Sequence, residues 1–115
     1  MMFGGGAKAY VCSSPVDMRK SIDGLAQLVT PLLAGDAFSG SVFVFLSRRR
    51  EKVKLLWWDR HGFWLAYKRL ERGRFPSPQV LASRGITVAE LMLWLEGVDL
   101  SRTRRLAVVN ATRIA

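Results

Sequence analysis

The strongest constraint on the fold comes from three short runs of β-forming residues that are separated by turn residues. Residues 42–46 (VFVFL) are continuously apolar, as in a strand that is buried on both faces. Residues 52–58 (KVKLLWW) and 63–70 (FWLAYKRL) flank a loop at residues 59–62 (DRHG), whose length and glycine suit a hairpin. The three runs therefore predict consecutive strands of an antiparallel sheet.

The hairpin loop also predicts which side chains of its two strands face one another. If the loop is symmetric, Trp57 pairs with Trp64 and Lys54 pairs with Tyr67. A shift of one residue would exchange these partners. In either register, aromatic side chains lie toward the turn and cations toward the far end. Because successive side chains of a strand point to opposite faces, at least one of Trp57 and Trp58 is expected in the core.

Two helices are predicted from capping signals and apolar spacing. The first starts at residues 14–17 (SPVD), which offer a capping serine, a proline for the first helical position and a capping-box acid. Pro31 is expected to end or kink it. The second starts with a capping box at residues 87–90 (TVAE) and is closed by Gly97. The apolar residues that share one face of the first helix are Met18, Ile22, Leu25 and Val29.

These elements predict one small α+β domain. With a β-like run at residues 8–12 (KAYVC), the element order is β-α-β-β-β-α. We expect an antiparallel sheet of three to four strands, with two main helices packed against one of its faces. The domain is expected to span residues 8–105, with flexible termini at residues 1–7 and 106–115.

The distribution of charge points to a polyanionic partner. The formal net charge is +9 and the isoelectric point is near 10.9, which favours nucleic acid over a membrane surface or an acidic protein. Ten of the 18 lysines and arginines fall within residues 38–75, against three acidic residues. An even spread of charge would indicate a solvated surface, whereas this cluster favours a binding surface.

Cysteine content and the lack of long apolar runs indicate the compartment in which the chain works. Cys12 is the single cysteine, so an internal disulfide is excluded and a reducing compartment is favoured. The first ten residues lack the apolar core of a signal peptide, and no run approaches the length of a membrane span. We therefore expect a soluble, cytoplasmic protein with no membrane contact.

The predicted binding surface combines cations with aromatic rings. Cations neutralise phosphates, exposed rings stack on unpaired bases, and a two-stranded ribbon can enter the major groove with its tip near base edges. The candidate nucleic-acid contacts are Arg48, Arg49, Arg50, Lys52, Lys54, Arg60, Lys68, Arg69, Arg72 and Arg74. The candidate stacking or interface residues are Trp57, Trp58, Tyr67 and Trp94, although paired large aromatics more often belong to a core.

Catalysis and metal binding are the weaker predictions. One histidine and one distant cysteine cannot make a zinc finger, and the acidic residues show no spacing that suits two-metal chemistry. Asp59 and His61 share a turn, but Asp59 and Gly62 suit turn geometry and need no other explanation. We therefore expect no catalytic residue, no metal and no cofactor, with a nuclease that uses Asp59 and His61 as a minor alternative.

Several runs of the chain resemble one protein family. They are residues 15–25 (PVDMRKSIDGL), 38–45 (FSGSVFVF), 54–59 (KLLWWD), 62–65 (GFWL) and 68–75 (KRLERGRF). The chain resembles the small accessory protein, called TnpB or Orf2-like, of bacterial insertion sequences of the sixty-six type, over about residues 8–105. It departs from that family at His61, where relatives tend to have an acidic residue, and after Leu95, where the similarity holds only in outline. The larger RNA-guided nuclease that is also called TnpB shows no resemblance.

The resemblance implies participation in transposition beside a separate, larger transposase that holds the catalytic acids. It implies no active site in this chain. Our first hypothesis is a non-catalytic accessory protein that binds transposon DNA through the basic aromatic sheet. The alternative is a protein-interaction module that docks on the transposase or self-associates, without DNA contact, with Trp94 or a sheet tryptophan as its anchor.

Overall fold

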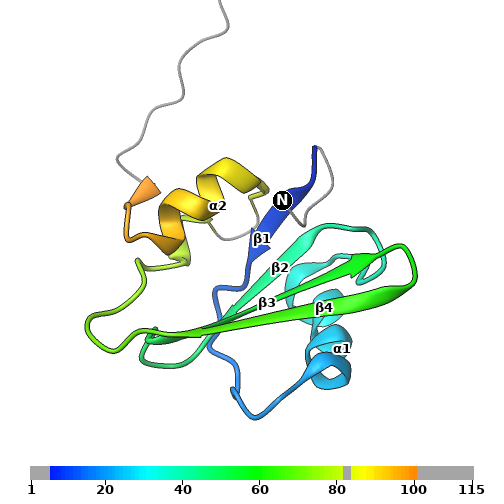
Figure 1. Cartoon of the computed structure of the whole chain (residues 1–115), viewed down its shortest axis with the longest axis horizontal. Coiled ribbons are helices and arrows are strands. Elements are labelled where there is room, and N and C mark those ends of the chain that lie inside the picture. The colour runs from blue at the N-terminus through cyan, green and yellow to red at the C-terminus, as the bar shows by residue number, and fades with distance from the viewer. Residues whose placement is uncertain (1–5, 82–83, 101–115) are drawn as a thin grey trace, which may run out of the picture.

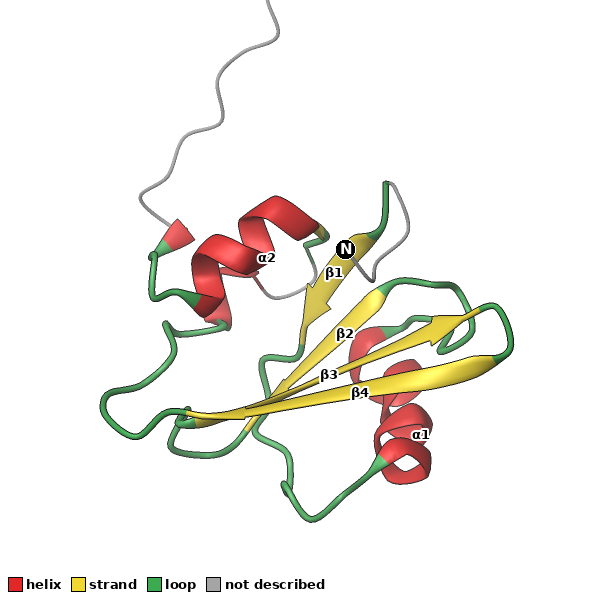
Figure 2. Cartoon of the chain, in the orientation of Figure 1, coloured by secondary structure: helices red, strands yellow, loops and turns green. Residues whose placement is uncertain are grey.

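The computed structural model describes residues 6–81 and 84–100. Its strands form one sheet in the order β4-β3-β2-β1-β5 (Figure 2). The strands are β1 (Lys8–Val11), β2 (Val42–Leu46), β3 (Lys52–Asp59), β4 (Gly62–Arg69) and β5 (Ile86–Thr87). The helices are α1 (Ile22–Leu33), the 3-10 turn η1 (Gln79–Leu81) and α2 (Val88–Leu95). The predicted termini lie outside the described residues, apart from Gly6 and Ala7.

The α+β class and the predicted element order are confirmed, with two additions. The sheet is mixed rather than purely antiparallel, because β1 pairs parallel with β2. These strands are joined through α1, and a long crossover of this kind allows a parallel pair. β5, which has only two residues, adds a fifth strand that pairs antiparallel with β1.

The two helices lie on opposite faces of the sheet, so the prediction that both pack on one face is wrong. All five residues of β2 are buried, and they alternate between two separate cores. Val42, Val44 and Leu46 share a core with Trp94 of α2. Phe43 and Phe45 share the other core with residues of α1. As Figure 1 shows, α1 lies behind β3 and β4, whereas α2 lies near β1.

The predicted register of the β3–β4 hairpin is confirmed. Trp57 is opposite Trp64 and Lys54 is opposite Tyr67. The turn is shorter than predicted, because Asp59 and Gly62 still pair as the last residues of the two strands. As a result, β4 forms one edge of the sheet with its full length of eight residues.

The first helix starts later than the predicted site at residues 14–17. Ser21 is the N-cap, and the helix begins at the next residue. Asp17 completes no capping box, because its carboxylate accepts the backbone N–H and the guanidinium of Arg19. These contacts lower the pKa of Asp17 to about 2. The segment before α1 is therefore held in a turn.

A buried lysine also holds this segment out of the helix. Lys54 Nζ donates hydrogen bonds to the backbone oxygens of Met18 at 2.8 Å and Lys20 at 2.7 Å. In a helix these two oxygens would accept the N–H groups four residues further on. The predicted apolar face is nevertheless correct, since Leu25 and Val29 are fully buried.

The first helix also continues past the proline that is predicted to end or kink it. Pro31 lies inside α1, which ends at Leu33. Ala34 then takes a left-handed conformation with φ of 51°, and its N–H bonds to the oxygen of Thr30. The predicted capping box of α2 is confirmed: Thr87 and Glu90 each accept the backbone N–H of the other. No helix among the described residues combines the length and apolar composition that a bilayer span requires.

Candidate nucleic-acid interface

Eight of the ten candidate cations come together at one end of the sheet, which we call the basic end. The β2–β3 turn contributes three of them, and β3 starts directly after it. The pairing of Lys52 with Arg69 and of Val53 with Lys68 brings the last residues of β4 to the same end. The basic end comprises Arg48, Arg49, Arg50, Lys52, Lys68, Arg69, Arg72 and Arg74.

Backbone hydrogen bonds hold the loop after β4 against the β2–β3 turn. The N–H of Leu70 donates to the oxygen of Glu51 at 2.7 Å, and the N–H of Phe75 donates to the oxygen of Arg50 at 2.7 Å. Arg72 and Arg74 lie between these two anchors. They are therefore kept beside the turn although they lie more than twenty residues later in the sequence.

The turn itself is fixed by contacts of Ser47. Its backbone oxygen accepts the N–H of Arg50 at 2.9 Å, and its hydroxyl oxygen accepts the N–H of Lys52 at 3.1 Å. Arg50 has a φ of 58°, in the left-handed region. This conformation reverses the chain and lets the arginine side chains project from the turn.

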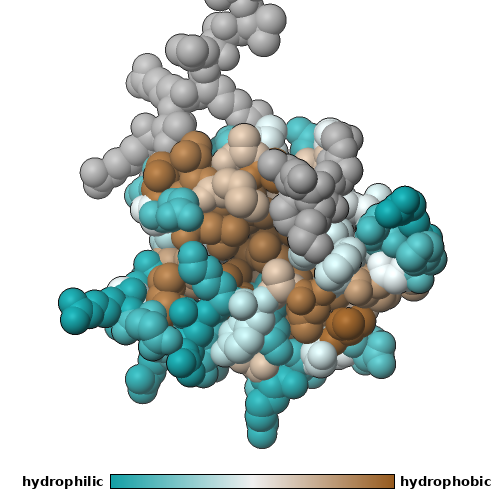
Figure 3. All heavy atoms as spheres, viewed as in Figure 1, coloured by the Kyte–Doolittle hydropathy of each residue, from teal (hydrophilic) through white to brown (hydrophobic). Residues whose placement is uncertain are grey.

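The cations of the basic end are largely free of carboxylate partners. Arg69 pairs with Glu71, with Nη2 and Oε1 3.0 Å apart, and this hydrogen bond raises the pKa of the guanidinium. Both side chains are well exposed, so the pair is weak and a phosphate can replace it. The other seven cations form no ion pair with a described residue. Hydrophilic side chains gather at this end, on the left of Figure 3.

Two of the ten candidate cations do not belong to this surface. Lys54 is only 9% exposed, and its ammonium group bonds to the backbone before α1 and lies 5.2 Å from the centre of the Tyr67 ring. Its prediction as a phosphate contact is therefore wrong. Arg60 is exposed, but it lies at the opposite end of the hairpin and pairs with Asp59 at 3.3 Å. Strands of this length separate it from the basic end by roughly 25 Å.

The four candidate aromatic residues differ in how far the structure exposes them. Trp94 is fully buried and Trp57 is 4% exposed, so neither offers a ring to a partner, and their prediction as stacking or interface residues is wrong. The expectation that at least one of the adjacent tryptophans is in the core is confirmed. Trp58 is half-buried and packs against Phe63 with 5.0 Å between ring centres. Tyr67 is 54% exposed and remains available.

The candidate residues omit one exposed tryptophan. Trp64 is 46% exposed on the edge strand β4, and it stacks on Trp57 with ring planes 17° apart. Its Nε1 donates to Asp59 Oδ2 at 3.3 Å, which fixes the ring. The predicted pairing with Trp57 was the available signal, because it places Trp64 on the outer strand of the hairpin, which has a neighbouring strand on one side only.

The described residues contain no arrangement that favours catalysis. The carboxylate of Asp59 accepts hydrogen bonds from Arg60 and Trp64, and His61 is exposed on the turn. In the part of the chain that the structure describes, no three His, Cys, Asp or Glu residues are grouped so that they can hold a metal ion. The hairpin turn is thus explained by its own hydrogen bonds.

Comparisons with known proteins identify relatives across nearly the whole chain. A family model described as "IS66 Orf2 like protein" matches residues 7–105. The uncharacterized protein y4jC of Sinorhizobium fredii is 33% identical over 111 residues, which cover 96% of this chain and 95% of the relative. The uncharacterized protein y4hO of the same organism is 33% identical over 97 residues, with 84% of each chain covered. No solved structure matches the chain.

Proposed function

Because the chain belongs to the IS66 Orf2-like family, we propose that it is a non-catalytic accessory protein of insertion-sequence transposition that binds transposon DNA through its basic end. Family membership connects the chain with an IS66-type transposition system. The observation that carries the proposal is the gathering of eight cations at one end of the sheet, where the only neighbouring acids in the turn and loop are Glu51 and Glu71.

The chemistry of the basic end suits a nucleic-acid backbone. Lysine and arginine neutralise phosphates and release condensed counterions, which supplies affinity without reading the sequence. Arginine also matches phosphate geometry with paired N–H groups. Tyr67 is exposed on β4 next to Lys68, so it adds a ring on which an unpaired base can stack. The catalytic acids of transposition belong, on this proposal, to a separate transposase.

The proposal predicts DNA binding that depends on salt and that weakens when three exposed cations of the basic end are replaced. In fluorescence anisotropy, log affinity for a duplex that carries the transposon end should fall linearly with log salt, with a slope of roughly −0.9 per phosphate contacted. The triple substitution Arg49→Ala, Lys68→Ala and Arg74→Ala should weaken binding roughly ten- to a hundredfold and flatten this slope. Scrambled duplex and single strand, measured alongside, show whether sequence or strandedness matters.

A matched variant separates the basic end from net charge. Lys8→Ala, Lys20→Ala and Arg60→Ala remove the same charge from exposed positions elsewhere on the chain. This control should retain most of the affinity. Equal losses in the two triple variants, or flat and weak binding of the unsubstituted protein to all three probes at low salt, would rule out the basic end as a DNA surface.

A second function, docking on the transposase, is favoured by the edge strand β4. One side of β4 has no strand beside it among the described residues, and a long exposed edge is a site where another chain can add a strand. Trp64 is half-exposed on this strand and held in one orientation by Asp59 and Trp57. Its rigid ring, rather than the buried Trp94, is the anchor that such an interface would use.

The docking function predicts that Trp64→Ala weakens the complex with the transposase of the same element. An aromatic anchor of this kind contributes about 2 kcal/mol, so the dissociation constant should rise roughly thirtyfold. His61→Ala, an exposed substitution on the same hairpin, should leave the complex unchanged. Binding of both variants with the affinity of the unsubstituted chain, measured by surface plasmon resonance, would exclude β4 as the docking surface.

A further inference from the structure

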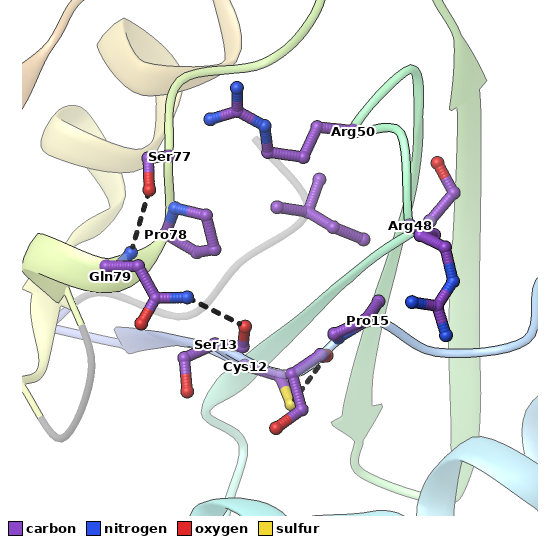
Figure 4. A pocket seen from close by; sticks show the side chains of 11 residues that line it. Cys12, Ser13, Pro15, Arg48, Arg50, Ser77, Pro78 and Gln79 are labelled. Atoms are coloured by element: carbon purple, nitrogen blue, oxygen red, sulfur yellow. Dashed lines mark hydrogen bonds between the residues drawn. The ribbon is translucent and has the colours of Figure 1, made fainter.

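A pocket of about 350 Å³ opens beside the basic end. Three segments that are distant in sequence form its walls: residues 12–15 after β1, the end of β2 with the β2–β3 turn, and residues 77–79. Figure 4 shows Arg48 and Arg50 projecting from the turn in different directions, with Arg50 pointing toward the segment that carries Ser77 and Gln79. The pocket is therefore lined by residues from several elements.

The pocket carries positive charge without a compensating acid. Arg48 and Arg50 are its only charged lining residues. Neither forms an ion pair with a described residue, and Arg50 is less exposed than the neighbouring Arg48 and Arg49. A half-buried cation with no partner favours an anionic occupant.

Two hydroxyls that line the pocket have a proton left to donate. Ser47 Oγ accepts the backbone N–H of Lys52 at 3.1 Å, and Ser77 Oγ accepts the backbone N–H of Gln79 at 3.4 Å. Each hydroxyl has one proton to donate, and neither accepting contact uses it. Gln79 Nε2 gives one of its two protons to the oxygen of Ser13 at 3.2 Å and keeps the other.

The one thiol in the wall adds no negative charge. Cys12 is buried, and burial raises the pKa of its thiol, which donates to the oxygen of Ser14 at 3.4 Å. The thiol is therefore protonated at neutral pH, and it does not repel an anion.

We infer that this pocket binds a single phosphate group, held by the guanidinium group of Arg50 and by the hydroxyl of Ser77. A phosphate combines negative charge with several acceptor oxygens, and it matches a guanidinium group together with a hydroxyl donor. The phosphate is either free orthophosphate or part of a nucleic acid. The second source rests on the proposed function, since the basic end would then bring the nucleic acid to the mouth of the pocket.

The first experiment titrates inorganic phosphate into the protein and follows binding by calorimetry and by 31P NMR. Arg50→Asn should weaken binding roughly tenfold, and Ser77→Ala should weaken it severalfold. Asparagine tolerates the left-handed φ of residue 50, so the turn should be retained. Arg72→Ala removes a cation of the basic end that does not line the pocket, and it should leave phosphate affinity unchanged.

The second experiment compares duplexes that carry a 5′-phosphate or a 5′-hydroxyl. A preference for the 5′-phosphate that Arg50→Asn removes assigns the pocket to a terminal phosphate. If the two duplexes bind equally well and Arg50→Asn loses more duplex affinity than Arg72→Ala, the pocket binds an internal phosphate of the DNA backbone. A third result is possible: inorganic phosphate binds and is weakened by Arg50→Asn, but no duplex binds. The ligand of the pocket is then orthophosphate, and the proposed DNA binding is overturned.

Two results would overturn the pocket assignment and leave the proposed function standing. In the first, inorganic phosphate does not bind, or it binds equally strongly to Arg50→Asn, to Ser77→Ala and to the unsubstituted protein. In the second, Arg50→Asn and Arg72→Ala lose the same duplex affinity. Arg50 then acts only as one more surface cation.

Discussion

Replacement of Trp94 by alanine is expected to lower the free energy of unfolding by about 3–5 kcal/mol, as for other large buried aromatic residues. Trp94 is fully buried and stacks on Phe75 with 5.7 Å between ring centres, and it joins α2 to the core on that face of the sheet. Domains of this size are stable by about 5–15 kcal/mol, so the loss is a large share of the total. Urea denaturation followed by tryptophan fluorescence and circular dichroism measures it.

Two further variants test whether the loss comes from the cavity. Trp94→Phe keeps a ring against Phe75 and removes an indole N–H that has no acceptor among the described residues, so it should cost less than about 1.5 kcal/mol. Trp64→Ala truncates the half-exposed tryptophan and should cost about 1 kcal/mol, the value of its stacking. If Trp94→Ala unfolds at the same urea concentration as Trp64→Ala, the packing of α2 contributes little to stability.

The prediction for Trp94 also changes how transposase binding is tested. Loss of a complex after Trp94→Ala would report a damaged core, because this residue has no exposed surface to offer a partner. The sequence alone does not separate the two roles. Residues 91–95 (LMLWL) are all apolar, and α2 buries Leu91 and Trp94 but exposes Met92 and Leu93. Which of them is covered depends on how α2 docks, and a pattern that is apolar on every side does not fix this.

Local signals predicted the features of the fold that depend on neighbouring residues. The hairpin register follows from the turn at residues 59–62, and the capping box of α2 follows from Thr87 and Glu90. The first helix was predicted to start at residues 14–17 because the local signals there are good. Its start is set instead by Lys54, which is more than thirty residues away in sequence, so no local pattern contains the answer.

The residues of the basic end were also predictable where they depend on strand pairing, and not where they depend on distant contacts. Strand pairing brings Lys52 beside Arg69, so a correct hairpin register already gathers most of its cations. Sequence did not show that Arg72 and Arg74 are tied to the turn by the bonds of Leu70 and Phe75. Nor did it show the phosphate pocket, because its wall residues come from three separate segments. Lys54 shares the β3 strand with Lys52, and only the packing of the segment before α1 distinguishes their roles.

This distinction between Lys52 and Lys54 leads to a second large effect on stability. Lys54→Met keeps the apolar stem and removes the ammonium group, so the backbone oxygens of Met18 and Lys20 lose their donor. Hydrogen bonds from a charged group contribute about 1.5–3 kcal/mol, and we expect a loss of about 2–3 kcal/mol in the free energy of unfolding. Lys68→Met changes an exposed lysine of the adjacent strand and should cost less than about 0.5 kcal/mol.

The same variants separate a structural lysine from one that binds phosphate. Lys54→Met should leave duplex affinity unchanged under conditions where the protein is folded, whereas Lys68→Met should weaken it severalfold. Once its two oxygens are released, the segment before α1 is free to become helical, and backbone chemical shifts of residues 17–21 should move toward helical values. Unchanged stability and chemical shifts together with weaker DNA binding in Lys54→Met would mean that this lysine leaves its backbone partners for a phosphate in solution. In that case its ammonium group belongs to the binding surface, and the start of α1 has another cause.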